Sequence, residues 1–518
     1  MTHTKELNGR PAVNPWLIAA AMVLPTFMVA LDTSVANVAL PYIAGSLSSS
    51  MDESTWVLTS YLVANAIILP ISGWISQVLG RKRFLIISMV VFTIASFLSG
   101  AAVSLGMLVF ARVIQGASGG ALLPISQAVL LESFPPEKRS EAMAAYALGV
   151  IVAPVVGPTL GGWITDSYSW RWVFYINLPV CLVAIMMARL FIEDPPYIRG
   201  KAPESVDYIG FALMAVGLAA LQLLLDRGER ADWFGSGWVW WATICTAVCL
   251  AGFVIRELNC SEPIVDLRVL GDRNFAVGFF LATIYGFILY GTLVMLPVFL
   301  ENLMGYTALN TGLAITPRGM GALVSVTFAG RYLKKIDGRV VICLGLVLLA
   351  CSLYILSGIN LEISIFSVIW PNVLMGFSIG MVFVVLTTMA VSTLANEKMG
   401  TATGLYNLMR GMGGSIGIAV VTTLQSRNAQ LHQAVMVSHL TPYTATFQQT
   451  VQKLEALFRA TGGSVGVQAK AYVVIYRTLT AQSNVWAFLD NCRMIACLAL
   501  CGIPAALLFK KPGIRKGH

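Results

Sequence analysis

The strongest constraint on the fold is a series of long apolar runs that recurs along the whole chain. About fourteen of them reach the roughly 20 residues that a helix needs to cross the hydrocarbon core of a membrane. We therefore expect an all-α polytopic membrane protein. The approximate limits of the runs are residues 16–37, 56–76, 84–104, 107–131, 141–164, 171–191, 208–226, 238–256, 275–300, 309–332, 340–358, 364–390, 400–424 and 486–509.

The composition supports the membrane assignment and excludes several other classes. Of the 518 residues, 57% are hydrophobic and only 11% are charged, which no soluble core requires. A net charge of +9 would suggest a nucleic-acid partner in a soluble chain. Here the lysines and arginines fall in short segments between apolar runs, so we expect no nucleic-acid partner. The nine cysteines are scattered without a Cys-x-x-Cys pair, and we interpret them as small buried residues rather than metal ligands.

The basic residues also predict the orientation of the chain. They concentrate in alternate connections, which the positive-inside rule assigns to the cytoplasm. An even number of spans then places both termini in the cytoplasm. The first run carries Asp32 and precedes many further spans, so we expect it to remain in the mature chain rather than to be removed as a signal peptide. The basic connections contain Arg81–Arg83, Lys138 and Arg139, Arg199 and Lys201, Arg268 and Arg273, Lys334 and Lys335, and Lys510 and Lys511.

An internal repeat divides the chain. Residues Arg112, Gly116 and Gly120 recur at a constant offset as Asn372, Gly376 and Gly380. Pro136-Glu-Lys138 recurs at the same offset as Asn396-Glu-Lys398. The repeat predicts two equivalent six-helix bundles with two helices inserted between them, and substrate should bind between the bundles. The expected units are an N-terminal bundle at residues 14–191, the two inserted helices at 205–258, and a C-terminal bundle at 272–511.

Small residues form a stripe along the predicted fifth helix. Gly149, Ala153, Gly157 and Gly161 recur at every fourth position, so a neighbouring backbone can approach closely. Pro154 and Pro158 lie on the same helix and lack the N–H groups that the carbonyls of residues 150 and 154 would otherwise receive. The helix should bend. The stripe can serve as a hinge, or it can be an ordinary packing surface.

Asp32 is the main acidic residue at membrane depth. A charge there costs at least a few kcal/mol unless it is paired or hydrated. Arg112, in the fourth predicted helix, lies at a similar depth and is its expected partner. We predict that Asp32 takes up a coupling proton with Arg112 as its neighbour. The alternative is a purely structural ion pair.

Other polar and aromatic residues within the spans are candidates for a substrate cavity. Arg318 and Arg410 have no obvious acidic partner in the sequence around them. They can bind an anionic substrate, gate the contact between the bundles, or donate to backbone carbonyls. The aromatic residues can equally pack in the core or lie at the membrane interface. The remaining cavity candidates are Gln115, Tyr146, Tyr285, Tyr290 and Tyr406.

Residues 427–484 form the one sizeable outer loop that we predict. Phe447, Val451, Leu454 and Phe458 fall on one helical face within it. This face can dock a partner protein, or it can cap the helices of the protein itself.

Several motifs resemble those of known transporters. Residues 149–162 resemble the motif that marks the export branch of the major facilitator superfamily. Residues 30–41 resemble the first-helix signature of the fourteen-helix drug:proton antiporters of the EmrB/QacA type, and residues 108–116 resemble the motif assigned to proton transfer. Residues 226–234 resemble the connection between the two extra helices of EmrB-like pumps.

The connection between the second and third helices resembles the cytoplasmic gating loop of the same family. Gly73 and Gly80 allow close packing, and Arg81 follows in the same segment. The family usually has Asp at the position of Gln77, so the charge latch formed by that Asp is not expected here.

The resemblance implies a proton-coupled multidrug exporter of the bacterial inner membrane that works by alternating access. It implies hydrophobic drugs or toxins as substrates, the proton gradient as the energy source, and no cofactor. It also implies an EmrA-like periplasmic adaptor and a TolC-like outer-membrane channel, which make up a tripartite pump. The alternative is a facilitator-type exporter of one metabolite or siderophore. A membrane enzyme is not expected, because the sequence shows no metal-ligand cluster, phosphate-binding loop or nucleophile elbow.

Overall fold

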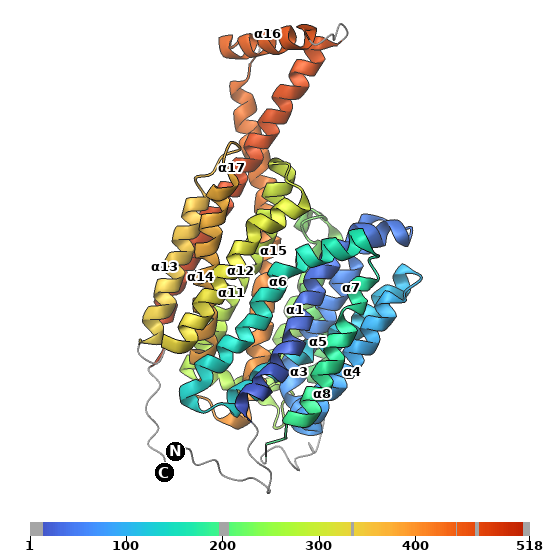
Figure 1. The fold of residues 1–518 in the computed structure, drawn as a ribbon, viewed down its shortest axis with the longest axis vertical. Coiled ribbons are helices and arrows are strands. Elements are labelled where there is room, and N and C mark those ends of the chain that lie inside the picture. The colour runs from blue at the N-terminus through green and yellow to red at the C-terminus, as the bar shows by residue number, and fades with distance from the viewer. Residues whose placement is uncertain (1–13, 196–206, 333–335, 442, 461–465, 511–518) are drawn as a thin grey trace.

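The computed structural model describes residues 14–195, 207–332, 336–441, 443–460 and 466–510. Within these residues every regular element is a helix, and most of the long helices run roughly along the longest axis of the molecule (Figure 1). We call the end that carries α16 (Ala445–Ala460) the stalk side. The opposite end, where α1 (Pro15–Ser46) begins and α17 (Val467–Leu507) ends, is the base. The basic residues Arg199, Lys201, Lys334, Lys335 and Lys511, and the predicted limits 205 and 511, lie outside the described residues.

The helices fall into two groups of six, with two more between them in the chain. The first group contains α1, α3 (Trp56–Leu79), α4 (Arg81–Gly100), α5 (Leu105–Ser133), α6 (Arg139–Ser167) and α8 (Asn177–Phe191), with the short α2 (Met51–Ser54), η1 (Pro136–Lys138) and α7 (Trp172–Tyr175). The second contains α11 (Arg273–Val298), α12 (Ala308–Tyr332), α13 (Gly338–Leu356), α14 (Ile365–Ala390), α15 (Met399–His439) and α17, with α16 and η6 (Asn396–Lys398). Between them come α9 (Tyr208–Arg227) and α10 (Gly237–Asn259).

The predicted all-α membrane fold is confirmed. Within the part of the chain that the structure describes, 12 helices are long and apolar enough to cross a membrane. Helices α12 and α15 have 25 and 41 residues, so they are also long enough, but their polar residues lower their hydropathy. The count of fourteen spans and the cytoplasmic position of the termini therefore remain predictions.

The internal repeat is visible in the packing. In the first bundle Gly116 of α5 lies so close to the backbone of Tyr61 in α3 that a side chain there would overlap it. In the second bundle Gly376 of α14 lies in the same way against the backbone of Arg318 in α12. The repeated turns are both 3₁₀ helices, η1 and η6. The predicted correspondence between the two halves is confirmed, while the domain limits stay predictions.

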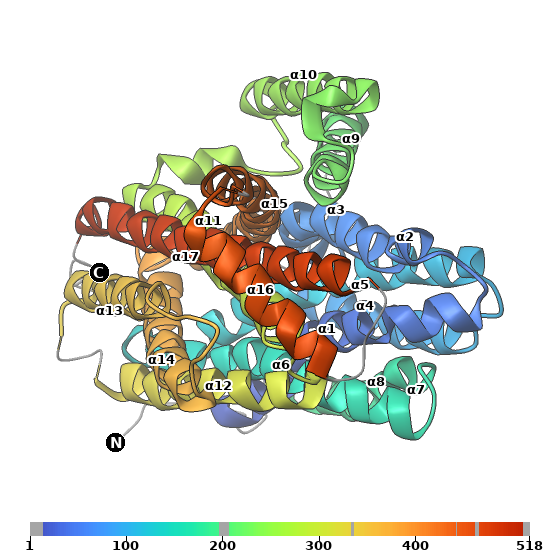
Figure 2. The ribbon, with the colours of Figure 1, turned by 90° about the horizontal axis from the view of Figure 1, so that it is seen from above.

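The two bundles meet through a symmetrical pair of contacts. Helix α6 packs along α12, where Gly319 lies against Val155, and α3 packs along α15, where Gly73 lies against Gly400 (Figure 2). Each contact joins the second helix of one bundle to the fifth helix of the other. Glycine at these positions lets the helix backbones approach closely, which favours a tight but separable interface.

The described part of residues 427–484, which we predict to be an outer loop with one helical face, is mostly helical. Helix α15 continues to His439 and α17 already begins at Val467, so both helices project beyond the bundles and carry α16 across their tips (Figure 1). Polar contacts join them: Gln425 Nε2 donates to the backbone oxygen of Asn484 at 3.0 Å, and His432 Nε2 lies 2.7 Å from Asp490 Oδ2. The packing of α15 and α17 on each other keeps both segments helical beyond their apolar runs. We call residues 427–439, α16 and residues 467–484 the stalk.

Helices α9 and α10 pack on each other, and α9 also packs against α3 (Figure 2). The end of α9 and the segment that follows it contact both bundles on the stalk side. Asp52, beside the start of α3, accepts from Arg227 at 3.2 Å and from Arg230 at 2.5 Å. Trp233 Nε1 donates to Thr423 Oγ1 of α15 at 2.9 Å. We call these contacts of residues 226–234 the outer clamp.

Candidate functional site

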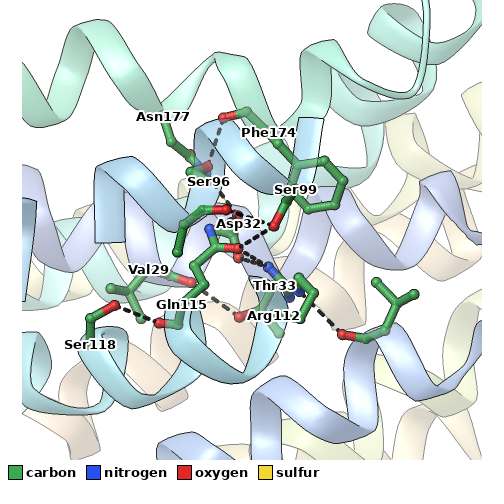
Figure 3. Close-up of polar contacts among 12 residues, drawn as sticks. Val29, Asp32, Thr33, Ser96, Ser99, Arg112, Gln115, Ser118, Phe174 and Asn177 are labelled. Atoms are coloured by element: carbon green, nitrogen blue, oxygen red, sulfur yellow. Dashed lines mark hydrogen bonds and ion pairs between the residues drawn. The ribbon is translucent and has the colours of Figure 1, made fainter. Parts of the chain in front are cut away.

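The predicted contact between Asp32 and Arg112 is present at the centre of the first bundle. Arg112 Nη1 of α5 lies 2.5 Å from Asp32 Oδ2 of α1, and neither side chain is exposed (Figure 3). Both belong to long apolar helices, so the pair is removed from water. Such a pair is stable only where further hydrogen bonds satisfy the remaining donors and acceptors.

Two amides complete the surroundings of the carboxylate. Gln115 Nε2 donates to Asp32 Oδ1 at 2.9 Å, and Asn177 Nδ2 of α8 donates to the same oxygen at 2.7 Å. Asn177 also donates to Ser96 of α4, at 2.9 Å (Figure 3). Side chains of α5 and α8 therefore meet at the one carboxylate of α1, and α4 is joined to it through Asn177.

Two aromatic rings lie beside the guanidinium group of Arg112. It lies 4.2 Å from the ring centre of Tyr61 and 5.5 Å from that of Phe174. Its Nε donates to the backbone oxygen of Val57 at 3.1 Å, while Nη2 has no hydrogen-bond partner. Aromatic faces stabilise a desolvated cation. The charge of Arg112 therefore depends on Asp32 as its counter-charge.

The other candidate residues form a second cluster, at the contact between the bundles. Its centre is Phe383 of α14, a residue that the sequence alone does not distinguish from core packing. The ring of Phe383 stacks on Tyr146 of α6 at 6.1 Å and lies 5.8 Å from the ring of Tyr285. The guanidinium group of Arg410 lies 5.6 Å from the same ring centre. We call Tyr146, Tyr285, Tyr290, Phe383, Tyr406 and Arg410, together with Arg318, the aromatic cluster.

Most of the predicted cavity residues are thus brought together, but one is not. Gln115 lies beside Asp32 in the first bundle and not in the aromatic cluster. A buried amide pair links the bundles near the cluster: Asn407 Nδ2 donates to Gln127 Oε1 at 2.6 Å. Lone polar residues in apolar helices, such as Asn177 and Asn407, were the sequence signal that could have identified these contacts.

The small-residue stripe of α6 packs within its own bundle. A side chain at Gly149 would overlap Thr26 of α1, and one at Gly157 would overlap Ser34. Gly161 lies against Val35, and Ala153 is fully buried. Ser34 Oγ also donates to the backbone oxygen of Pro154 at 3.3 Å, which gives a partner to the carbonyl that Pro158 leaves free. The close contact is confirmed, while a hinge role stays a prediction.

The predicted gating loop lies at the base and joins the bundles. Gly73 contacts the backbone of Gly400, and Gln77 Nε2 donates to the backbone oxygen of Glu397 at 3.4 Å. Gln77 thus still forms a bond across the interface at the position where the family has Asp. Gly80 has a φ of +83°, which favours glycine, and Arg81 pairs with Glu132 of α5.

The predicted stripe on α16 is largely covered by the protein itself, which favours the capping alternative, while docking of a partner at these residues stays a prediction. Val451 is buried, Phe447 stacks on Tyr472 of α17 at 6.1 Å, and Leu454 and Phe458 are half-buried. The apolar face of α16 is covered by the neighbouring helix because an amphipathic helix buries its apolar side wherever a partner lies nearby. The stripe therefore fastens α16 to the stalk.

A cavity of about 580 Å³ opens below the stalk, between α11, α15 and α17. This volume falls within the range of pockets that hold drug-sized molecules. Its lining is mainly apolar with a few amides, and includes Met295, Phe299, Val421, Gln425, Asn484 and Phe488.

Comparisons with known proteins agree with this architecture. Residues 22–418 match the Major Facilitator Superfamily. The chain is 38% identical to the fatty acid resistance protein FarB of Neisseria gonorrhoeae, over 87% of this chain and 88% of that protein. It is 36% identical to the multidrug export protein EmrB of Escherichia coli strain K12, over 88% of each chain.

A solved structure shows the same fold at low sequence identity. The human organic anion transporter MFSD10 superposes with a TM-score of 0.58 at 13% identity, over 95% of this chain and 100% of that structure. At this identity the likeness concerns the fold alone.

Proposed function

The chain belongs to the major facilitator superfamily, and from this membership we propose that it is a proton-coupled exporter of hydrophobic, chemically varied toxic compounds. It is a multi-pass protein of the bacterial inner membrane. The names of its relatives concern multidrug export and resistance to fatty acids, which supports hydrophobic substrates. The proton gradient drives the transport without a cofactor.

The single observation that supports proton coupling best is the enclosed pair of Asp32 and Arg112. Protonation of Asp32 removes the counter-charge of Arg112, and leaving a buried charge unpaired costs about 3 to 5 kcal/mol. A protonated Asp32 therefore cannot persist in the arrangement of Figure 3 without movement of α1, α5 or α8. Proton uptake is in this way linked to a rearrangement of the first bundle.

The two symmetrical contacts between the bundles support alternating access. The contact of Gly73 with Gly400 closes the base, which we assign to the cytoplasm, and the outer clamp bridges both bundles on the stalk side. Opening one side while the other stays closed exposes the aromatic cluster to one compartment at a time.

The stalk supports a tripartite assembly in which an EmrA-like periplasmic adaptor leads to a TolC-like outer-membrane channel. The stalk exposes apolar side chains away from α16, among them Val435 of α15 and Val473 and Tyr476 of α17. Water alone does not favour exposed apolar side chains on paired helices, whereas an adaptor helix would cover them. The adaptor is expected to bind this surface of the stalk.

Transport into inverted membrane vesicles under an imposed pH gradient tests the proposal. The wild-type protein is expected to accumulate several structurally unrelated hydrophobic dyes. Asp32→Asn is expected still to bind the dyes but to accumulate none of them, because it cannot exchange a proton. The exposed Glu362→Gln serves as the control and should behave as wild type.

Two results would contradict the proposal. Uphill accumulation by Asp32→Asn would remove Asp32 from the coupling step. Accumulation of only one compound by the wild-type protein would indicate an exporter dedicated to a single metabolite.

A further inference from the structure

The second bundle contains two buried cationic side chains that have no acidic partner among the described residues. Arg318 of α12 and Arg410 of α15 are only 4% and 3% exposed. Among the residues that the structure describes, no carboxylate forms an ion pair with either of them. The first bundle differs, because there Arg112 is paired with Asp32.

The hydrogen bonds of both guanidinium groups are incomplete. Arg318 Nη2 donates to Thr292 Oγ1 at 2.8 Å and to the backbone oxygen of Leu289 at 3.5 Å. For Arg410, neither Nε nor Nη1 has a hydrogen-bond acceptor. A guanidinium group carries five N–H donors, and two of them can bind the two oxygens of one carboxylate at the same time. The donors of Arg410 are therefore available for an anion.

The surroundings of these arginines are aromatic. Phe383 lies 5.6 Å from the guanidinium group of Arg410, and the ring of Tyr285 lies 5.8 Å from that of Phe383. Both arginines border α11 and α14: Arg318 donates to Thr292 of α11 and its backbone lies against Gly376 of α14, while the Arg410 backbone lies against Gly286 of α11 and its guanidinium group lies beside Phe383 of α14. Tyr406 is buried, and its hydroxyl has no partner.

We propose that Arg318 and Arg410 form an anion subsite that binds the carboxylate group of an amphipathic substrate, whose apolar part packs against Phe383, Tyr285 and Tyr146. The inference rests on the proposed export function and specifies one substrate class for it. Tyr146 belongs to the first bundle and stacks on Phe383, so the ligand lies at the contact between the bundles. The anion supplies the counter-charge that the second bundle lacks.

This substrate class has an electrical consequence. When one monoanion leaves the cell in exchange for one proton that enters, the net transfer is two positive elementary charges inward. Each charge moved through 100 mV is worth about a fiftyfold concentration gradient. The export of a carboxylate is therefore driven by the membrane potential, whereas the exchange of a monocation for one proton is electroneutral.

Three fluorescent probes with the same apolar part test the subsite. Pyrenebutyrate is anionic, pyrenebutanol is neutral and pyrenebutylamine is cationic, and binding is measured by energy transfer from tryptophan in phosphatidylcholine nanodiscs, where no anionic lipid competes. The wild-type protein is expected to bind the acid about tenfold or more tightly than the alcohol, and the amine most weakly.

Variants then assign the preference to the two arginines. Arg410→Gln and Arg318→Gln are each expected to weaken binding of the acid about tenfold while changing binding of the alcohol less than about twofold. Arg410→Lys is expected to retain part of the preference, because it keeps the charge but loses the paired donors. Arg459→Gln, an exposed arginine of α16, is the matched control and should change neither probe.

Equal affinity of the wild-type protein for the acid and the alcohol would overturn the subsite, and this comparison needs no variant to fold. An equal loss of both probes in the glutamine variants would also overturn it, because that result indicates damage to packing and not loss of a charge. Insensitivity of pyrenebutyrate transport to an imposed potassium diffusion potential would refute the electrical consequence. If neutral and cationic dyes are still exported against a gradient in that case, the proposed function stands while the anion subsite fails.

Discussion

Asn177 shows how one neutral side chain can hold a charged site together. Its amide donates to Asp32 of α1 and to Ser96 of α4, so α8 is joined to both helices through a single group. Ser96 in turn donates to the backbone oxygen of Phe174 at 2.8 Å. The position of the Asp32 carboxylate is thus fixed by uncharged amides as well as by the charged Arg112.

Replacing Asn177 is expected to weaken this arrangement. Asn177→Leu removes a donor from a buried carboxylate, which costs about 1 to 3 kcal/mol. The thermal midpoint of the purified protein should fall by a few degrees, and proton-driven transport should decline. Asn259→Leu is the control, because the Asn259 amide donates only to its own helix at an exposed position. An unchanged midpoint in Asn177→Leu would show that the donor is dispensable.

The residues that sequence alone could identify are those whose chemistry conflicts with an apolar helix. Asp32 and Arg112 stand out because a charge at membrane depth needs a partner, and their contact was predictable from matching depths. Phe383 does not stand out, since one phenyl ring is common in such helices, and the lone amide of Asn177 indicates a polar contact without identifying its partner. Their importance follows only from which helices meet, and that depends on three-dimensional packing.

At the scale of single elements, α6 serves two interfaces with opposite faces. One face places Gly149 and Gly157 against α1, and the other places Val155 against Gly319 of α12. The first contact lies within a bundle and the second lies between bundles. A movement of α12 past α6 can therefore occur without disturbing the contact of α6 with α1.

A pair of glycine substitutions in α6 tests this difference. In Gly157→Ala the added methyl group would overlap Ser34, so we expect a loss of about 1 to 3 kcal/mol and reduced efflux. In Gly162→Ala nothing lies within 4 Å of the new atom, so stability should rise slightly because alanine favours the helix. Thermal unfolding in detergent measures both. Equal midpoints would mean that α1 and α6 are not in firm contact.

The stalk shows what sequence analysis misses at the scale of whole helices. An apolar run reports which part of a helix can lie in lipid, not where the helix ends. Helices α15 and α17 are each 41 residues long, although the apolar runs within them cover little more than half of that length. The polar part of each helix stays helical because α15 and α17 pack on each other. A hydropathy profile of the sequence does not detect such packing.

At the scale of the whole molecule, separate contacts close the base and the stalk side. The base is closed by backbones that meet at Gly73 and Gly400, a contact that is apolar and tight. The stalk side is bridged by the outer clamp, in which the Asp52 side chain is 67% exposed. Exposed ion pairs are each worth about 0.2 to 1 kcal/mol, so the clamp is the weaker closure.

Removing the carboxylate of Asp52 from the outer clamp should therefore loosen the stalk-side contact only modestly. Asp52→Asn is expected to increase amide hydrogen exchange in residues 226–234 by about two- to fivefold, because the ion pairs of Asp52 with Arg227 and Arg230 are lost. High salt should produce a similar increase in the wild-type protein. Arg493→Gln, which removes an exposed pair with Asp490, is the control. Unchanged exchange in Asp52→Asn would mean that Trp233 and its neighbours hold the segment without Asp52.

The continuity of α15 turns it into a lever. No proline interrupts this helix between its start at the base and its tip under α16. At 1.5 Å per residue its 41 residues span about 60 Å, so a tilt of about 10° near the base displaces the tip by about 10 Å. Arg410 lies in the lower half of the same helix. A protein attached to the tip would thus be moved mechanically each time the bundle beneath it changes its angle.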